Sequence, residues 1–173
     1  MLKGRRNFTH RINTKTQNME NWFQCTVKYE KTQEDGGLKK VSEPYLVDAI
    51  SFTEAEKRII EEIKPYMSGA YEVADIKRAR YVEIFESTAE SADRFFRFKL
   101  VFITLDEKTG KEKKSTQNVL VQAADVRDAI ARLDEGTKGS VTDFTISAIA
   151  ETPIMDVFHY QVRSEAEAAA AQQ

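Results

Sequence analysis

The sequence predicts an α+β protein built as a tandem duplication of a β-β-α-β(-β) unit. Three observations support this fold class. Residues 22–31 and 95–102 each alternate between apolar and polar side chains, as half-buried strands do. Two later segments begin with a helix-capping residue and continue with apolar residues at helical spacing. Residues 39–61 also align without gaps on residues 113–135, with 8 of 23 positions identical.

The predicted organisation is a single globular domain over residues 19–160, made of two repeats at 22–86 and 95–159. With one helix for each repeat, we expect the helices to pack on one face of antiparallel sheet and the repeats to share a continuous core about a pseudo-two-fold axis. Residues 1–18 are basic and without periodicity, so they are either a disordered arm or a segment preceding a native start at Met19. The Ala-rich tail, residues 161–173, is expected to be disordered.

The first repeat opens with a strand at 22–31 that places alternate residues on one face, namely Phe23, Cys25, Val27 and Tyr29. Residues 34–37, Glu-Asp-Gly-Gly, predict a hairpin turn because glycine accepts the positive φ that such turns need. The returning strand runs to Ala49. Pro44 lacks a backbone donor, which predicts a sheet edge or a bulge there.

A capped helix follows this hairpin. Ser51 is the predicted N-cap, with Glu54 reaching back to the cap N–H in a capping box. The apolar face consists of Phe52, Ala55, Ile59, Ile60 and Ile63, and Pro65 ends the helix near Ile63. Residues 71–85 have strand composition but are too long for one strand, so we predict a bulge or two strands before a polar connector at 86–93.

The second repeat restates this pattern. Its first strand alternates through Phe96, Phe98, Leu100 and Phe102, and a Lys-Thr-Gly turn at 108–110 closes its hairpin. Asp125 is the predicted N-cap of the second helix, and Gly136 is its predicted end. Residues 144–158 match 71–85 at an offset of 73, with Pro153 interrupting the second copy.

Composition narrows the class of protein. The chain has 173 residues, 41% hydrophobic and 31% charged, and one cysteine, which excludes an intramolecular disulfide and suits a reducing compartment. No apolar run approaches the roughly 20 residues that span a bilayer, so we expect no membrane segment and a cytoplasmic location. Residues 19–160 hold 20 basic and 26 acidic residues, and this net charge of −6 argues against a broad basic surface.

The sequence offers little catalytic chemistry. It has two histidines, His10 and His159, and no His or Cys spacing suited to zinc. It also has no phosphate-binding glycine pattern. Cys25 alternates with apolar residues, so we expect a buried small hydrophobe rather than a nucleophile. The prediction is therefore a protein without catalytic residues, metal or cofactor, and not an enzyme.

The first strand of each repeat carries aromatic and basic residues on the face away from the expected core. Such a face can stack bases and follow phosphates, which predicts a single-stranded nucleic-acid binder, most specifically of DNA. A basic run in the first repeat would extend this track. The candidate residues are Trp22, Lys28, Lys77, Arg78, Arg80, Phe95, Arg97 and Lys99.

Two alternatives remain open. Trp22 and Phe95 can instead fill the interface between the repeats while the cations only solvate the sheet. The rival function is an interaction or adaptor protein that recognises another protein through its acidic surface and its sheet edges. Oligomeric state is open under both functions.

Segments 21–31, 43–56, 102–113 and 151–158 resemble an uncharacterised domain-of-unknown-function family associated with gut anaerobic bacteria and their large tailed phages. The resemblance runs from about Met19 to Tyr160. It implies no established activity and no catalytic residues. Its phage association implies a role in DNA replication, or in countering host defence, as an expectation.

Overall fold

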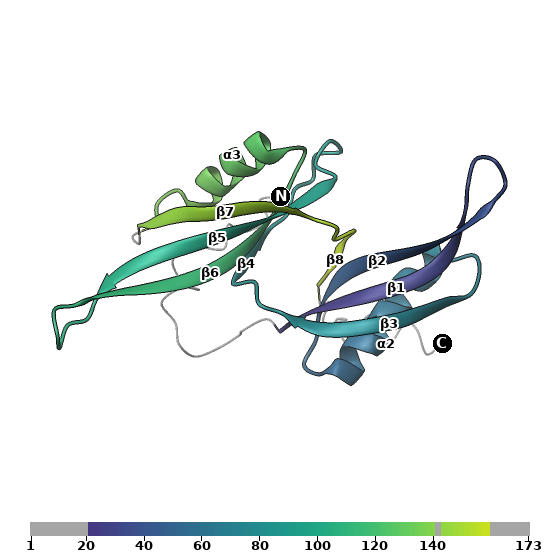
Figure 1. Ribbon diagram of the computed structural model, residues 1–173, viewed down its shortest axis with the longest axis horizontal. Helices are drawn as coiled ribbons and strands as arrows, with labels where there is room; N and C mark the ends of the chain where they lie inside the picture. The colour runs from purple at the N-terminus through teal and green to yellow at the C-terminus, as the bar shows by residue number, and fades with distance from the viewer. Residues whose placement is uncertain (1–20, 141–142, 160–173) are drawn as a thin grey trace, which may run out of the picture. The chain divides into compact units, whose positions relative to one another are not determined.

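The computed structural model describes residues 21–140 and 143–159, so the predicted arm and tail lie outside the described residues. The described part of the chain confirms the α+β class (Figure 1). In chain order its elements are β1 (Trp22–Thr32), β2 (Leu38–Asp48), α2 (Phe52–Ile63), the short 3₁₀ helix η1 (Lys64–Tyr66), β3 (Tyr71–Ala79), β4 (Glu83–Phe85), β5 (Arg94–Leu105), β6 (Glu112–Ala123), α3 (Val126–Thr137), β7 (Phe144–Thr152) and β8 (Val157–Phe158).

The chain divides into two compact units, which are described separately. The first unit contains Asn21–Arg78 and returns at Asp156; its sheet has the strand order β3-β1-β2-β8. The second unit contains Ala79–Met155, and its sheet has the order β4-β6-β5-β7. Each unit has a long hairpin, one further long strand beside it and one helix after the hairpin.

The unit boundaries differ from the predicted repeats, because each sheet takes its short edge strand from the other repeat. β4, in the first predicted repeat, pairs in parallel with β6. β8, in the second predicted repeat, pairs in parallel with β2. The sheets are therefore mixed rather than purely antiparallel. The matching strand orders accord with duplication, which stays a prediction.

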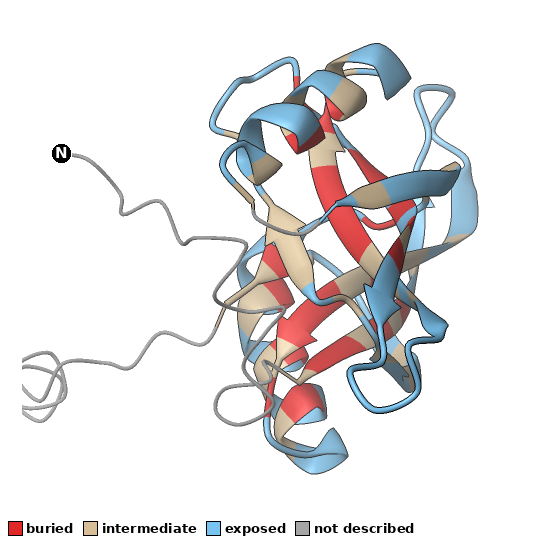
Figure 2. Ribbon diagram, turned by 90° about the vertical axis from the view of Figure 1, so that its left-hand side faces the viewer, coloured by how far each residue is buried: buried red, intermediate tan, exposed pale blue. Residues whose placement is uncertain are grey.

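Each unit has its own apolar cluster between the sheet and the helix (Figure 2, buried residues in red). In the first unit the helix residues Ala55, Ile59 and Ile63 pack on Phe23, Cys25 and Val27, as the strand and helix periodicities predicted. In the second unit the cluster joins Ala129 and Leu133 of α3 to alternate residues of β5 and β6. Ile60 and Phe52, expected on the buried face of α2, are 37% and 48% exposed.

The predicted capping box of α2 is present with one change. Ser51 Oγ accepts from the Glu54 N–H at 3.1 Å, as expected. The Glu54 carboxylate accepts at 2.7 Å from the N–H of Ile50, one residue before the cap, instead of from Ser51 itself. Both contacts occupy backbone donors at the helix start that would otherwise lack partners.

The second helix begins as predicted, since Asp125 Oδ1 accepts from the Asp128 N–H at 2.8 Å. It continues through Gly136 to Thr137, so the predicted end at Gly136 was one residue early. Gly136 has no positive φ; the residue that does is Gly139, at +84°. The ring of Phe85 lies so close to Gly136 that it leaves no room for a Cβ there, which accounts for the glycine.

Residues 71–85 form two strands, which was one of the two predicted outcomes: β3 belongs to the first sheet and β4 to the second. The matching β7 contains an irregularity, because its register with β5 shifts between Lys99 and Leu100 and skips Ser147. Pro44 also lies where predicted. The outer side of β2 pairs with β8 only at Leu46 and Val47, so Pro44 stands at an edge of the described sheet.

Candidate functional site

The two aromatic residues of the predicted nucleic-acid surface are buried. Trp22 is 3% exposed and Phe95 is 1% exposed. The ring of Trp22 also meets His159 edge-on, with 5.1 Å between the ring centroids. A base can stack only on an exposed ring face. The structure thus corrects the expectation that these residues are stacking platforms, and burial was the alternative that the sequence left open.

The predicted basic run does not form one track. The Arg78 guanidinium lies over the rings of Phe23 and Phe52, 5.2 and 5.6 Å from their centroids. These rings belong to the helix side of the first sheet, so Arg78 is a packed cation on that side. Lys77 is exposed on β3, and Arg80 belongs to the second unit.

Three of the predicted cations are exposed on strand faces opposite a helix. Lys28 lies on β1 in the first unit. Arg97 and Lys99 lie on β5 in the second unit, where they alternate with the buried Phe96, Phe98 and Leu100. Neither Arg97 nor Lys99 forms an ion pair with another described residue. Sequence reasoning therefore placed Arg97 and Lys99 correctly while misjudging the exposure of Phe95.

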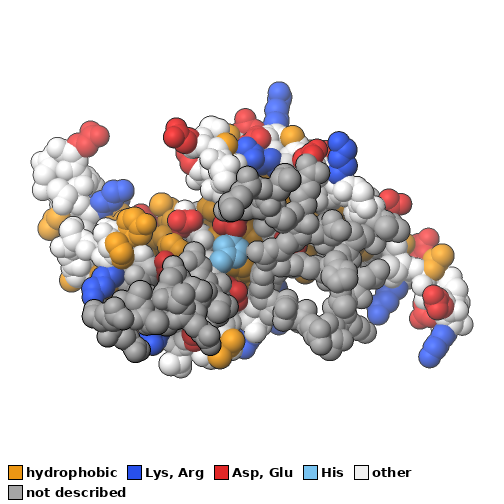
Figure 3. Space-filling model, turned by 180° about the vertical axis from the view of Figure 1, so that it is seen from behind, with side chains coloured by type: hydrophobic (Ala, Val, Ile, Leu, Met, Phe, Trp, Pro, Cys, Tyr) orange, Lys and Arg blue, Asp and Glu red, His pale blue; other side chains and the backbone are white. Residues whose placement is uncertain are grey.

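The described residues visible on one face of the molecule do not form a large basic surface (Figure 3). On the face shown in Figure 3, acidic, basic and apolar side chains of the described residues are interspersed. This agrees with the net charge of −6 over residues 19–160. Interspersed charges favour short-range recognition over the broad attraction that a basic surface exerts on nucleic acid.

Residues 21–140 and 143–159 contain no group of three or more His, Cys, Asp or Glu side chains placed to hold a metal. No helix in these ranges combines the length and apolar character needed to cross a bilayer. Cys25 is fully buried, and burial, reinforced by the nearby charges of Asp75 and Glu56, raises its pKa to about 12. Because the thiolate is the reactive form, Cys25 is a packing residue as the sequence predicted.

The outer edge of β7 is an unpaired sheet edge in the described part of the second unit. This strand ends its sheet, and no described strand pairs with its outer side (Figure 1). It is nine residues long, and residues 145–148 are all exposed. Glu151 is its one charged residue. Such an edge presents a row of N–H and C=O groups to an incoming strand.

The other exposed edges carry features that discourage strand addition. The matching strand β3 has four charged residues, Glu72, Asp75, Lys77 and Arg78. The outer parts of β2 and β6 carry lysine pairs at 39–40 and 113–114, and β2 also carries Pro44. Lysine, proline and dense charge are the usual protections of sheet edges. The β7 edge has no lysine, no proline and only one charged residue. Its only protective feature of this kind is the register irregularity at Ser147.

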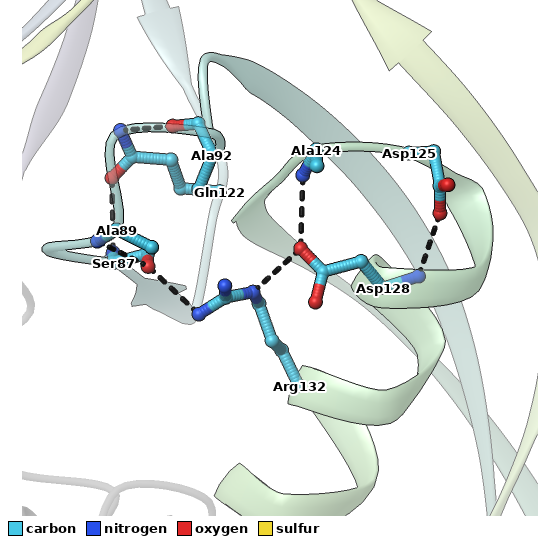
Figure 4. A network of polar contacts seen from close by, with 8 residues as sticks. All are labelled: Ser87, Ala89, Ala92, Gln122, Ala124, Asp125, Asp128 and Arg132. Atoms are coloured by element: carbon cyan, nitrogen blue, oxygen red, sulfur yellow. Dashed lines mark hydrogen bonds and ion pairs between the residues drawn. The ribbon is translucent and has the colours of Figure 1, made fainter.

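The opposite edge of the second sheet is covered by the chain itself. β4 pairs with Val119–Val121 of β6, and the Val82 N–H donates to the Asn118 carbonyl at 2.9 Å. The connector after β4 is then tied down by the Gln122 side chain. Its Oε1 accepts from the Ser87 N–H and its Nε2 donates to the Ala92 carbonyl, both at 3.0 Å (Figure 4).

Helix α3 holds the same connector through Arg132. Its Nη1 donates to Ser87 Oγ at 2.7 Å, and its Nε donates to Asp128 Oδ2 at 2.9 Å (Figure 4). The same Asp128 oxygen accepts from the Ala124 N–H at 2.9 Å. These contacts, with the Ala124 bond as the larger cause, hold the pKa of Asp128 below its ordinary value. The connector at residues 86–93, predicted only as a polar loop, is thus held in place by side-chain hydrogen bonds from β6 and α3.

Sequence reasoning missed the β7 edge, although a signal was present. The alignment of 71–85 on 144–158 compares a charged strand with a nearly uncharged one. Which strand lies at the edge of a sheet depends on strand order, which local periodicity does not contain.

Fold and site together define a small α+β protein with an accessible sheet edge. Residues 21–160 match the family described as a domain of unknown function, DUF4494, and the chain belongs to that family. This confirms the resemblance to an uncharacterised domain family. No curated protein matches the chain.

Proposed function

We propose that this chain is a non-enzymatic interaction protein that recognises another protein by strand addition to the outer edge of β7. The observation that carries the proposal is the accessible nine-residue edge with a single charge. In strand addition, main-chain hydrogen bonds supply affinity, and pockets for alternate side chains supply specificity. The function is the adaptor alternative that the sequence left open, now attached to a particular strand.

The side chains of β7 indicate what kind of segment would fit. On the helix side of the sheet it presents Phe144, Ile146 and Ile149, which pair with Phe102, Leu100 and Phe98. Ile146 is 38% exposed. On the other side it presents small residues, Thr145, Ala148 and Ala150. A partner strand that alternates apolar and small residues would therefore extend both faces of the second sheet. Basic residues on either side of that partner strand would be attracted by the net negative charge of residues 19–160.

A matched pair of lysine substitutions tests the proposal. Ser147→Lys puts a charge at the middle of β7, at a position without a register partner on β5. Ala74→Lys makes the same change in charge at the predicted equivalent position in β3, where the side chain is also exposed. Lysine on an edge strand discourages pairing. Both variants should retain the circular dichroism spectrum and unfolding midpoint of the parent.

The partner would be sought by affinity purification from the native host, and its binding measured with purified components. We expect Ser147→Lys to weaken binding by about tenfold or more and Ala74→Lys to leave it unchanged. Backbone amides of β7 should gain protection from hydrogen exchange in the complex. A partner that binds both variants equally, or that protects another element instead, would overturn the assignment to β7.

The nucleic-acid function remains a second proposal, supported by one observation. The side chains of Arg97 and Lys99 are both exposed on the face of β5 away from α3, and neither has an acidic described partner. They can follow phosphates, although Trp22 and Phe95 are not exposed for stacking. Replacing both cations with glutamine should flatten the salt dependence of oligonucleotide binding by about 0.7 per lost phosphate contact. Anisotropy that shows no binding at low salt would remove this proposal.

The setting of either function is likewise proposed. A cytoplasmic location accords with the single, buried Cys25. The family resemblance suggests a phage-related role, in countering host defence for the protein-binding function or in DNA replication for the nucleic-acid function. Identification of the captured partner would discriminate between these roles.

A further inference from the structure

Two tyrosines and a glutamate converge on the helix side of the first sheet. The hydroxyls of Tyr29 and Tyr45 both donate to Oε2 of Glu43, at 2.9 and 3.0 Å. The β1–β2 register places Val27 opposite Glu43, and Cys25 opposite Tyr45. Because Cys25 and Val27 face α2 in the core cluster, the tyrosines and the glutamate share that face.

The two tyrosine hydroxyls occupy only one of the two carboxylate oxygens of Glu43. Oε2 receives both hydrogen bonds, whereas Oε1 of Glu43 accepts none from a described residue. Burial, followed by the bond to Glu43, raises the pKa of both Tyr29 and Tyr45, so both phenols stay protonated and keep donating at neutral pH. The ring of Tyr45 is fixed in turn by stacking on Phe158, with 5.9 Å between centroids and 21° between planes.

The fold does not require this arrangement. At the corresponding positions the second sheet has Phe102, Gln117 and Val119, in the same register relation across its hairpin. That sheet forms with the same strand order and without a carboxylate on its helix side at this level. The first unit therefore places a half-buried negative charge where the second unit places a neutral amide, and no described basic residue forms an ion pair with it.

We propose that Glu43, oriented by Tyr29 and Tyr45, is a binding site for the primary ammonium group of a lysine side chain on a partner. A carboxylate attracts a cation through its charge and through charge-assisted hydrogen bonds. With Oε2 saturated, one oxygen remains for the ligand. A guanidinium needs both oxygens for its paired hydrogen bonds, whereas an ammonium acts as a point charge and needs only one. This site lies in the first unit, so it goes beyond the β7 proposal and does not depend on it.

The full-length chain can be tested with small probes. Nα-acetyl-lysine amide would be titrated while the backbone amide signals are followed by NMR, beside the arginine analogue and the uncharged norleucine analogue. We expect saturable shifts at Tyr29, Glu43 and Tyr45, with lysine bound about tenfold more tightly than norleucine and more tightly than arginine. Equal binding of lysine and norleucine, or no shifts at these residues, would overturn the proposal.

Variants assign the effect to the carboxylate. Glu43→Gln should abolish lysine binding, whereas Glu30→Gln, an exposed acid on the same hairpin, should leave it unchanged. The double variant Tyr29→Phe, Tyr45→Phe keeps the rings and frees Oε2, so preference should move toward arginine. If Glu43→Gln does not fold, the double variant tests the proposal instead. An unchanged preference for the lysine analogue over the arginine analogue in that variant would refute the proposed geometry. Loss of partner binding at β7 would leave these titrations unaffected.

Discussion

Phe85 of β4 lies against the backbone of α3 at Gly136, so closely that a Cβ at position 136 would lie 2.5 Å from Phe85 Cε1. No real Cβ tolerates such a separation, and the obstacle is a ring held in a packed cluster. The glycine is therefore present to admit the ring. The same strand, β4, pairs with β6, in a sheet other than that of its predicted repeat.

Gly136→Ala should destabilise the protein. In an unobstructed helix this change stabilises by about 0.5–1 kcal/mol, because alanine restricts the unfolded chain. Overpacking costs about 1–3 kcal/mol, so the cost of the clash with Phe85 should exceed the gain from the less flexible unfolded chain. We expect a net loss of about 1–2 kcal/mol in the free energy of unfolding. Urea denaturation measures the loss. In a Phe85→Ala background the same substitution should become neutral or stabilising; an unchanged loss there would show that Phe85 is not the cause.

Trp22, the only tryptophan, should report a buried environment. We expect blue-shifted emission and weak quenching by iodide in the native protein, and a red shift on unfolding. Addition of single-stranded oligonucleotide should leave the emission unchanged, because the ring is not available for stacking. Trp22→Ala should cost about 3–5 kcal/mol of stability, as for other large core truncations. Strong quenching by oligonucleotide would restore the stacking hypothesis.

The Asp128 carboxylate should make stability depend on acid pH. Its folded pKa is lowered by the Ala124 N–H and by Arg132, so its contribution is present above the unfolded pKa of about 3.8 and is lost as pH falls through the folded value. Asp128→Asn should lower the unfolding midpoint at neutral pH, and the difference from the parent should shrink in strong acid. Asp134→Asn, on an exposed part of the same helix, is the control. A difference that does not vary with pH would contradict the linkage.

Cys25 should be inert in the folded protein. Burial raises its pKa to about 12, and its side chain is fully buried, so neither thiolate nor access is available. A thiol-disulfide reagent such as DTNB should react slowly at neutral pH and fast in denaturant. Rapid reaction under native conditions would show that β1 opens readily or that the thiol is not buried.

Local chemistry determined most of the elements. Alternation defined β1 and β5, side-chain caps at Ser51 and Asp125 defined the helix starts, and Asp-Gly-Gly defined the first hairpin turn. Each of these signals depends on residues within a few positions of one another, which is why they can be read without the fold. The same signals identified the charged residues Arg97 and Lys99 on an outer strand face.

The tertiary structure alone decided where the short strands pair, which aromatic rings are buried and which edge stays open. β4 and β8 are three and two residues long, too short to carry a pattern, and their partners are chosen by contacts such as Phe85 with Gly136. Alternation assigns Trp22 and Phe95 to a face but does not say what covers that face. Tyr29 and Glu43 are 14 residues apart and meet only through hairpin register. Such facts arise from surfaces that come together after the elements form, and so no local pattern contains them.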